Sequence, residues 1–225
     1  FFTEQRPGDR LEVLMQQEYK VGHDKPLWGG RGRILAAVYH GQATKEKENW
    51  AIRYLPSGET QVEYFDLNGQ AVRKAFRRSP FSYSGFRVTS HFTQRRFHPI
   101  LRTYRPHHGT DYACAQGTPV VAVGKGTVVF AGWKGGYGNV IDIQHGKKYL
   151  TRYGHLSKML VKQGQLISEG QLIGKSGMTG LSTGPHLHFE IHEYGKPKNF
   201  LRMNFPSAKA VTAQDMAEFN AQKTE

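Results

Sequence analysis

Short apolar runs separated by glycine dominate the chain from Phe81 onward, and they limit what this region can fold into. Runs of about four to eight apolar residues fit β-strands and are too short for the helices of a globular core. The runs that we interpret as strands are 86–91, 110–113, 119–123, 126–132, 139–144, 148–155 and 187–192. The region is therefore predicted to form an antiparallel sheet or a barrel-like sandwich, and the fold class is mostly β.

The first 80 residues are predicted to form a smaller β-rich domain. Strands are expected at 10–19, 33–40, 50–55 and 60–67, and Asn68-Gly69 after the last of them is a strong hairpin signal. A basic segment that ends at Pro80 marks the predicted boundary. We expect domains over 1–80 and 81–205 and a tail over 206–225. In that tail, Thr212 and Asp215 predict a short helix.

A repeated segment and the composition add further constraints. Residues 164–177 contain Gly-Gln-Leu-Ile twice, and we interpret them as a tight β turn between core strands. Cys114 is the only cysteine, so neither an internal disulfide nor a cysteine metal cluster can form. No apolar stretch approaches the roughly 18 residues of a membrane span. The chain starts with Phe1-Phe2, and we expect that any export signal or N-terminal anchor has been removed.

The net charge of +13 is concentrated in residues 81–225, which carry 18 Lys and Arg against 8 Asp and Glu. Such a field attracts polyanions, although a solvated basic surface is the simpler interpretation. No recognition helix, Arg-Gly repeat or pattern of stacking aromatics accompanies the charge. Nucleic acid is therefore not an expected partner.

Histidines gather in three short segments whose spacing favours a metal site. The segments are His107-His108-Gly109-Thr110-Asp111, Tyr153-Gly154-His155-Leu156 and Gly184-Pro185-His186-Leu187-His188-Phe189-Glu190. Side chains two apart on a strand share one face. His186 and His188 therefore point the same way while Leu187 faces the core. Glu190 and His192 continue the histidine face if the strand stays regular.

One histidine and one aspartate from 107–111 would complete a site with three ligands and an open position for water, as catalytic zinc requires. Zinc in such a site would activate water and polarise a carbonyl. The spacing alone leaves open whether His107 or His108 is the ligand. An isolated His-x-His pair is more often a surface feature or part of a core, so the combination of segments carries the hypothesis.

These segments, in this order, resemble the catalytic domain of lysostaphin-type (LytM-like) zinc metallopeptidases over residues 86–199. Within that family the chain is most similar to the Gram-negative murein DD-endopeptidases of the MepM type. Further matching stretches are Phe97-His98-Pro99-Ile100, Gly117-Thr118-Pro119-Val120, Gly135-Gly136-Tyr137-Gly138-Asn139 and Gly180-Leu181-Ser182-Thr183. The resemblance selects His107, Asp111 and His188 as ligands of one zinc ion. It implies that His155 and His186 are the catalytic histidines.

A basic segment from 87 to 105 is predicted to line the substrate groove. It contains Arg87, Arg95, Arg96, Arg102 and Arg105 and no acidic residue. Arginine binds carboxylates through two parallel hydrogen bonds, although any single arginine could equally belong to a loop without a specific partner. The residues predicted to contact substrate are Arg95, His98, Arg102, Tyr137, Asn139, Ser182 and Thr183.

The resemblance implies a zinc-dependent peptidoglycan hydrolase that cleaves peptide cross-links between D-alanine and diaminopimelate by metal-activated water. Its partner would be the peptide stems of peptidoglycan, in the periplasm or cell envelope of a Gram-negative bacterium. A non-catalytic peptidoglycan-binding or activator protein on the same fold is the alternative. The N-terminal domain would bind the wall, cover the groove to restrain activity, or space the enzyme from a lost anchor, and a monomer is the default expectation.

Overall fold

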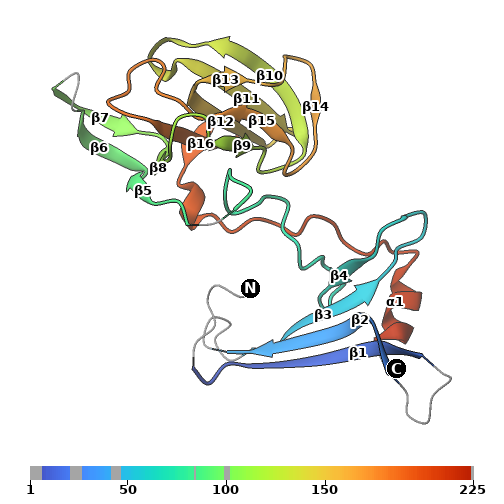
Figure 1. The fold of residues 1–225 in the computed structure, drawn as a ribbon. Coiled ribbons are helices and arrows are strands. Elements are labelled where there is room, and N and C mark those ends of the chain that lie inside the picture. The colour runs from blue at the N-terminus through green and yellow to red at the C-terminus, as the bar shows by residue number, and fades with distance from the viewer. Residues whose placement is uncertain (1–6, 21–26, 42–46, 84, 99–101, 224–225) are drawn as a thin grey trace. The chain divides into compact units, whose positions relative to one another are not determined.

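The computed structural model describes residues 7–20, 27–41, 47–83, 85–98 and 102–223, with the side chains of 18–20, 27–31 and 98 outside the description. It divides the chain into two compact units, both drawn in Figure 1. The first unit consists of Phe1–Lys74 and Pro206–Glu225, and the second of Ala75–Phe205. This division differs from the predicted one, which placed the boundary after residue 80 and set 206–225 apart as a tail.

The C-terminal segment belongs to the first unit because its helix α1 (Met216–Gln222) supplies a core side chain. Phe219 is fully buried, and its ring lies 5.4 Å from that of Tyr54 and 6.0 Å from that of Phe65 in edge-to-face geometry. Such pairs stabilise beyond the area that they bury. A fragment that carries the second unit alone should therefore end near residue 205.

The predicted helix signal lies in the turn before α1. The backbone N–H of Asp215 donates to Thr212 Oγ1 at 3.2 Å, and the Thr212 hydroxyl donates to Asp215 Oδ2 at 3.0 Å. The helix begins one residue later, at Met216. The two residues therefore lie in the turn before the helix, and the N-cap position falls on Asp215 and not on Thr212 as the spacing predicted.

A four-stranded antiparallel sheet in the order β1-β2-β3-β4 forms the rest of the first unit. Its strands are β1 (Arg10–Lys20), β2 (Leu27–His40), β3 (Asn49–Tyr54) and β4 (Glu63–Phe65). The chain turns after β4 at Gly69, whose φ of 69° favours glycine. Phe65 and Ala71 then pair in antiparallel fashion across the turn that Asn68-Gly69 predicted.

The second unit is built on a sheet in the order β14-β10-β11-β12-β16-β8-β5, with β17 added to β16. These strands are β5 (Val88–Ser90), β8 (Thr110–Ala113), β10 (Gly126–Trp133), β11 (Asn139–His145), β12 (Tyr149–Leu156), β14 (Leu166–Ile167), β16 (His186–Glu193) and β17 (Lys196–Lys198). Short 3-10 helices occur at η3 (Gly135–Tyr137) and η4 (Phe200–Arg202). Neighbouring strands pair antiparallel, so the mostly β prediction is confirmed.

Smaller sheets complete this unit. A three-stranded sheet has the order β13-β15-β9, from β9 (Pro119–Val121), β13 (Lys158–Met159) and β15 (Leu172–Lys175). Residues 164–177 therefore form more than a turn, since they supply β14 to one sheet and β15 to another. A separate hairpin pairs β6 (Thr93–His98) with β7 (Thr103–His107), within the segment that the sequence marked only as basic.

Strand β16 alternates between the core and the functional face of the sheet. Leu187, Phe189 and Ile191 are fully buried in the main hydrophobic cluster of the second unit. The residues that alternate with them, His186, His188 and Glu190, therefore project from the opposite face. This confirms the predicted alternation and anchors the histidine pair on a rigid central strand.

The described part of the chain contains no helix with the length and apolarity that a membrane crossing requires.

Candidate metal and catalytic site

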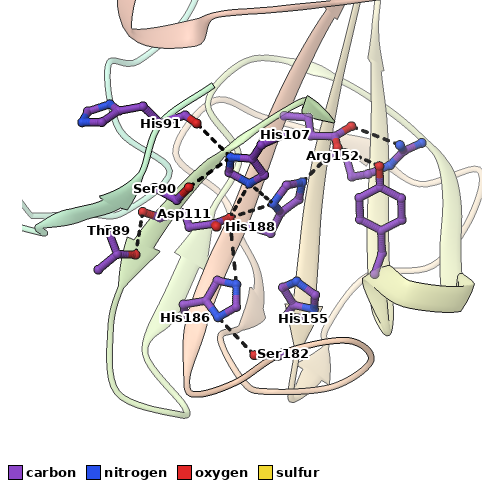
Figure 2. A network of polar contacts seen from close by, with 12 residues as sticks. Thr89, Ser90, His91, His107, Asp111, Arg152, His155, Ser182, His186 and His188 are labelled. Atoms are coloured by element: carbon purple, nitrogen blue, oxygen red, sulfur yellow. Dashed lines mark hydrogen bonds and ion pairs between the residues drawn. The ribbon is translucent and has the colours of Figure 1, made fainter. Parts of the chain in front are cut away.

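Two neighbouring strands bring Asp111 and His188 face to face. The antiparallel register of β8 and β16 pairs His188 directly with Asp111, and the register of β12 and β16 pairs His188 with Gly154. His107 is the last residue of β7 and reaches the same point from the hairpin. Figure 2 shows the side chains of these three predicted ligands converging.

The donor atoms of this trio fit a metal ion. His107 Nε2 lies 3.0 Å from Asp111 Oδ1, His188 Nδ1 lies 2.8 Å from the same oxygen, and the two ring nitrogens are 3.2 Å apart. Tetrahedral zinc with bonds of about 2.0–2.1 Å separates its ligand atoms by roughly 3.3 Å. All three side chains are buried, and they form the one such group among the described residues.

Gly109 makes this convergence possible. A Cβ at this position would lie 2.6 Å from Cε1 of the His188 ring and 2.6 Å from the carbonyl oxygen of Phe189. The backbone between His107 and Asp111 therefore packs directly against the imidazole. Any side chain larger than hydrogen would push His188 away from the other two ligands.

Hydrogen bonds on the far side of each ligand ring select the nitrogen that faces the site. His107 Nδ1 donates to the carbonyl oxygen of His91 at 2.9 Å, which leaves Nε2 to face Asp111. His188 Nε2 donates to Glu190 Oε1 at 2.9 Å, which leaves Nδ1 as the metal-facing atom. Such partners fix both the tautomer and the orientation of a ligating histidine.

Carboxylates and imidazoles shift each other's pKa values in this buried site. Burial alone would lower the pKa of His188, but hydrogen bonds to Asp111 and Glu190 outweigh it and raise the pKa to about 9. Burial would raise the pKa of Asp111, yet its contacts with His107 and His188 hold it well below the usual range. Burial would likewise raise the pKa of Glu190, but hydrogen bonds to His188 and His192 hold that pKa well below its usual range. Asp111 and Glu190 are therefore carboxylates at neutral pH and can orient the imidazoles.

Glu190 is the centre of a buried polar network behind His188. Its side chain is 1% exposed, and its Oε1 also accepts a hydrogen bond from the Tyr137 hydroxyl at 2.8 Å. Its Oε2 accepts from Arg152 Nη1 at 3.1 Å and from His192 Nε2 at 2.6 Å. The network therefore holds Glu190 in place as the partner of His188 Nε2.

The charge of this network is balanced across three strands. Arg152 is opposite Asp142 on one side and opposite Glu190 on the other. Its guanidinium donates to both oxygens of Asp142 at 2.8 Å as well as to Glu190. Two-point contacts of this kind hold both groups rigidly, so the carboxylate behind His188 has a fixed position and a compensated charge.

His155 and His186 lie side by side next to the ligand trio, with ring centroids 4.6 Å apart. His155 Nδ1 donates to the carbonyl oxygen of Thr179 at 2.7 Å, and His186 Nδ1 donates to that of Gly184 at 2.8 Å. Each neutral ring therefore carries its lone pair on Nε2. His186 Nε2 lies 3.9 Å from Asp111 Oδ1, beside the ligand atoms.

The backbone of His155 is in a conformation that favours glycine. Its φ is 58°, in the left-handed region. For residues other than glycine such conformations cost on the order of 1–3 kcal/mol and concentrate at functional sites. Burial lowers the pKa of His155 to about 4, and the neighbouring His186 and His188 contribute to this shift. The ring is thus a neutral base at physiological pH.

A cleft of about 400 Å³ opens over these groups. The η3 loop, the 181–183 loop and the β6–β7 hairpin supply its walls. The lining residues are Arg96, Arg105, Pro106, His107, His108, Asp111, Gly136, Tyr137, His155, Leu181, Ser182, Thr183, His186, His188 and Glu190.

The structure brings some predicted substrate contacts into the cleft and leaves others outside it. Tyr137, Ser182 and Thr183 line the cleft. Asn139 instead donates from its side-chain amide to the carbonyl oxygen of Leu156 at 3.0 Å, which joins the start of β11 to the end of β12. Its role as a substrate contact stays a prediction.

Two of the three predicted contacts on the β6–β7 hairpin, Arg95 and Arg102, do not line the cleft. Arg95 stacks over the Tyr104 ring at 4.5 Å, and Arg102 is exposed with a φ of 51°. The side chain of His98 is outside the described residues. Two other arginines of the basic segment, Arg96 and Arg105, line the cleft in their place.

The sequence analysis did not identify Arg152 as a partner of Glu190, although the sequence contained an indication of it. It is a charged residue in the middle of the predicted strand 148–155, and charges that a core strand buries are usually paired. Arg96 and Arg105 could be identified as cleft residues only from the structure of the hairpin, because alternation along β6 and β7 determines which arginines face the cleft.

The chain is similar to known peptidases. Residues 105–200 match the model of peptidase family M23. The chain is 47% identical to the peptidoglycan DD-endopeptidase ShyA of Vibrio cholerae, in an alignment that covers 100% of this chain and 49% of ShyA. It is 38% identical to the peptidoglycan DD-endopeptidase ShyC of the same species, with 98% of this chain and 48% of ShyC covered. A solved structure of a zinc-containing peptidase from Vibrio cholerae is 33% identical, with 92% of this chain and 60% of that chain covered and a TM-score of 0.57. The chain spans about half the length of the curated relatives that it matches.

Proposed function

The chain belongs to peptidase family M23 through its second unit, and we propose that it is a zinc-dependent DD-endopeptidase that hydrolyses peptide cross-links in peptidoglycan. The observation that carries the proposal is the convergence of His107, Asp111 and His188 beside His155 and His186 in one cleft. The names of ShyA and ShyC support the substrate class. One zinc ion per chain and a periplasmic or envelope location belong to the same proposal.

The donor set suits zinc, since it offers two imidazole nitrogens and one carboxylate oxygen and leaves a fourth position open. Zinc held by His107 Nε2, Asp111 Oδ1 and His188 Nδ1 would supply Lewis-acid chemistry that polarises an amide carbonyl and acidifies water. Glu190 keeps the proton of His188 on Nε2, away from the ligand atom.

His155 and His186 would carry the proton transfers. The lone pair on Nε2 of one ring accepts a proton from the attacking water, and the resulting imidazolium returns it to the nitrogen of the leaving amine. A protonated Nε2 on either ring can also donate a hydrogen bond to the oxyanion that develops on the carbonyl oxygen. The carbonyls of Thr179 and Gly184 keep each Nδ1 protonated and each ring oriented throughout.

Cross-linked muropeptide dimers provide the test. The chain should convert dimers to monomers, as measured by mass spectrometry, and a chelator should prevent the conversion. The mass and sequence of the products identify the hydrolysed bond. A zinc-loaded chain that leaves dimers intact would contradict the proposal and favour a peptidoglycan-binding protein on the same fold.

Glu190→Gln should weaken zinc affinity by about 10- to 100-fold, because the neutral amide no longer orients His188 as a charged acceptor. The affinity is measured by competition with a chromophoric chelator. Glu193→Gln is the matched control, since Glu193 ends the same strand and pairs with the surface residues Lys148 and Lys198. Equal affinities for the two variants would show that Glu190 does not act through the metal site.

A further inference from the structure

Two arginines face each other at the edge of the catalytic cleft. The register of the β6–β7 hairpin places Arg96 directly opposite Arg105. Like charges at directly opposed positions of an antiparallel pair destabilise the pair. Both residues nevertheless line the cleft, so the hairpin presents two guanidinium groups to whatever occupies it.

The alternation of the hairpin separates these arginines from their neighbours. Phe97 and Tyr104 are the next opposed pair, and their rings pack 5.7 Å apart on the other face, where Arg95 stacks over Tyr104. Arg105 and the metal-site residue His107 are two positions apart on β7 and therefore share a face, with Cα atoms roughly 6.6 Å apart.

The two arginines differ in how far the protein neutralises them. Arg96 donates to Ser90 Oγ at 2.6 Å, and its Nη2 lies 3.6 Å from Asp111 Oδ2, so it is tied to the metal site. Arg105 is exposed and makes no ion pair or hydrogen bond with another described side chain. Its five N–H donors remain available to a ligand.

We infer that Arg105, supported by Arg96, forms a subsite for a free carboxylate on the substrate, next to the bond that is cut. This inference rests on the proposed function. In a cross-link between D-alanine and the diaminopimelate side chain, the carbon attached to the scissile amide nitrogen carries a free carboxylate. This carboxylate lies close to the scissile bond, as Arg105 lies close to the metal site, two residues before His107 on β7. The fork of Arg105 can bind both of its oxygens.

The subsite makes the enzyme selective for the charge of its substrate. Amidation of that carboxylate removes the negative charge and replaces one acceptor oxygen with a donor group. The two guanidinium groups then face a neutral partner and lose a charge-assisted contact. The same loss follows when Arg105 itself is replaced, so the effects of the two changes should overlap.

Synthetic cross-linked dimers that differ only in this carboxylate, free or amidated, test the inference. The wild type should cleave the free dimer with a kcat/KM roughly 10- to 100-fold higher than the amidated one. Arg105→Gln should lower kcat/KM for the free dimer by a similar factor, mainly through KM, and reduce the ratio between the dimers toward one. Arg105→Lys, which keeps the charge but not the fork, should fall between.

Lys147→Gln is the control, because it removes the same charge from an exposed turn residue outside the cleft. Zinc content and thermal unfolding of each variant are measured alongside. Cleavage of both dimers with equal efficiency by the wild type, or an equal loss on both dimers in Arg105→Gln, would overturn the carboxylate subsite while leaving the endopeptidase intact. Failure of the wild type to cleave either dimer would instead overturn the proposed function, and the subsite with it.

Discussion

Replacing His188 with alanine should abolish stoichiometric zinc binding and reduce cross-link cleavage by at least about 10³-fold. His188 supplies one of the three donor atoms, 2.8 Å from Asp111 Oδ1 and 3.2 Å from His107 Nε2. Without it the site offers two ligands, fewer than structural or catalytic zinc sites use. A loss of this size corresponds to roughly 4 kcal/mol of transition-state stabilisation, in the range expected for metal-assisted hydrolysis.

Zinc content by elemental analysis and initial rates on muropeptide dimers check this expectation. The variant leaves Glu190 buried without its imidazole partner, so thermal unfolding is compared with that of the chelator-treated wild type. His107→Ala repeats the test from a different strand. His91→Ala is the control, since the exposed His91 side chain points away from the ligands in Figure 2 and its contact with His107 comes from the backbone. A His188→Ala protein with full zinc content and normal rates would exclude the proposed site.

His186→Ala and His155→Ala should retain zinc and lose roughly 10²- to 10⁴-fold in kcat. Neither residue belongs to the ligand trio, and both have Nδ1 anchored on a backbone carbonyl, so their removal deletes a proton carrier and leaves the metal ligands in place. KM should change far less than kcat, because the proton transfers occur in the transition state. The double variant should lose less than the product of the two single effects if the rings act as a unit.

The pH profile of the wild type tests His155 as the general base. A general base must be deprotonated to work, so kcat/KM falls as the pH drops through the pKa of that base. Burial lowers the pKa of His155 to about 4, and activity that depends on His155 as the base should persist down to about that pH. An acidic limb well above pH 4, in protein that still contains its zinc, would contradict this expectation and show that a group other than His155 controls the rate at acidic pH. Loss of zinc from His155→Ala or from His186→Ala would contradict the assignment of that histidine to proton transfer.

The sequence places the candidate site residues most accurately where local geometry controls their positions. The two-residue repeat of a strand is enough to put His186, His188 and Glu190 on one face and Leu187 in the core. Five of the twelve residues predicted for the site form the ligand trio and the histidine pair in one cleft. The prediction was less complete for the β6–β7 hairpin, because its charged segment lacks the apolar alternation that marks a strand.

The domain boundary shows a similar limit. Thr212 and Asp215 predicted a helix in the tail but gave no indication of what it packs against, and the aromatic contacts of Phe219 with Tyr54 and Phe65 join segments more than 150 residues apart. Only packing could assign 206–225 to the first unit.

The sequence by itself determined the mostly β class, the histidine face of β16 and, through its family resemblance, the identity of the candidate ligands. These properties depend on residue type and on spacing within one strand or turn. The tertiary structure decided which ring nitrogen faces the metal site, how Arg152 and Tyr137 hold Glu190, and which arginines reach the cleft. His188 and Asp111 are 77 residues apart, and their contact depends on the register of two strands, which the chain sets only when its whole core packs.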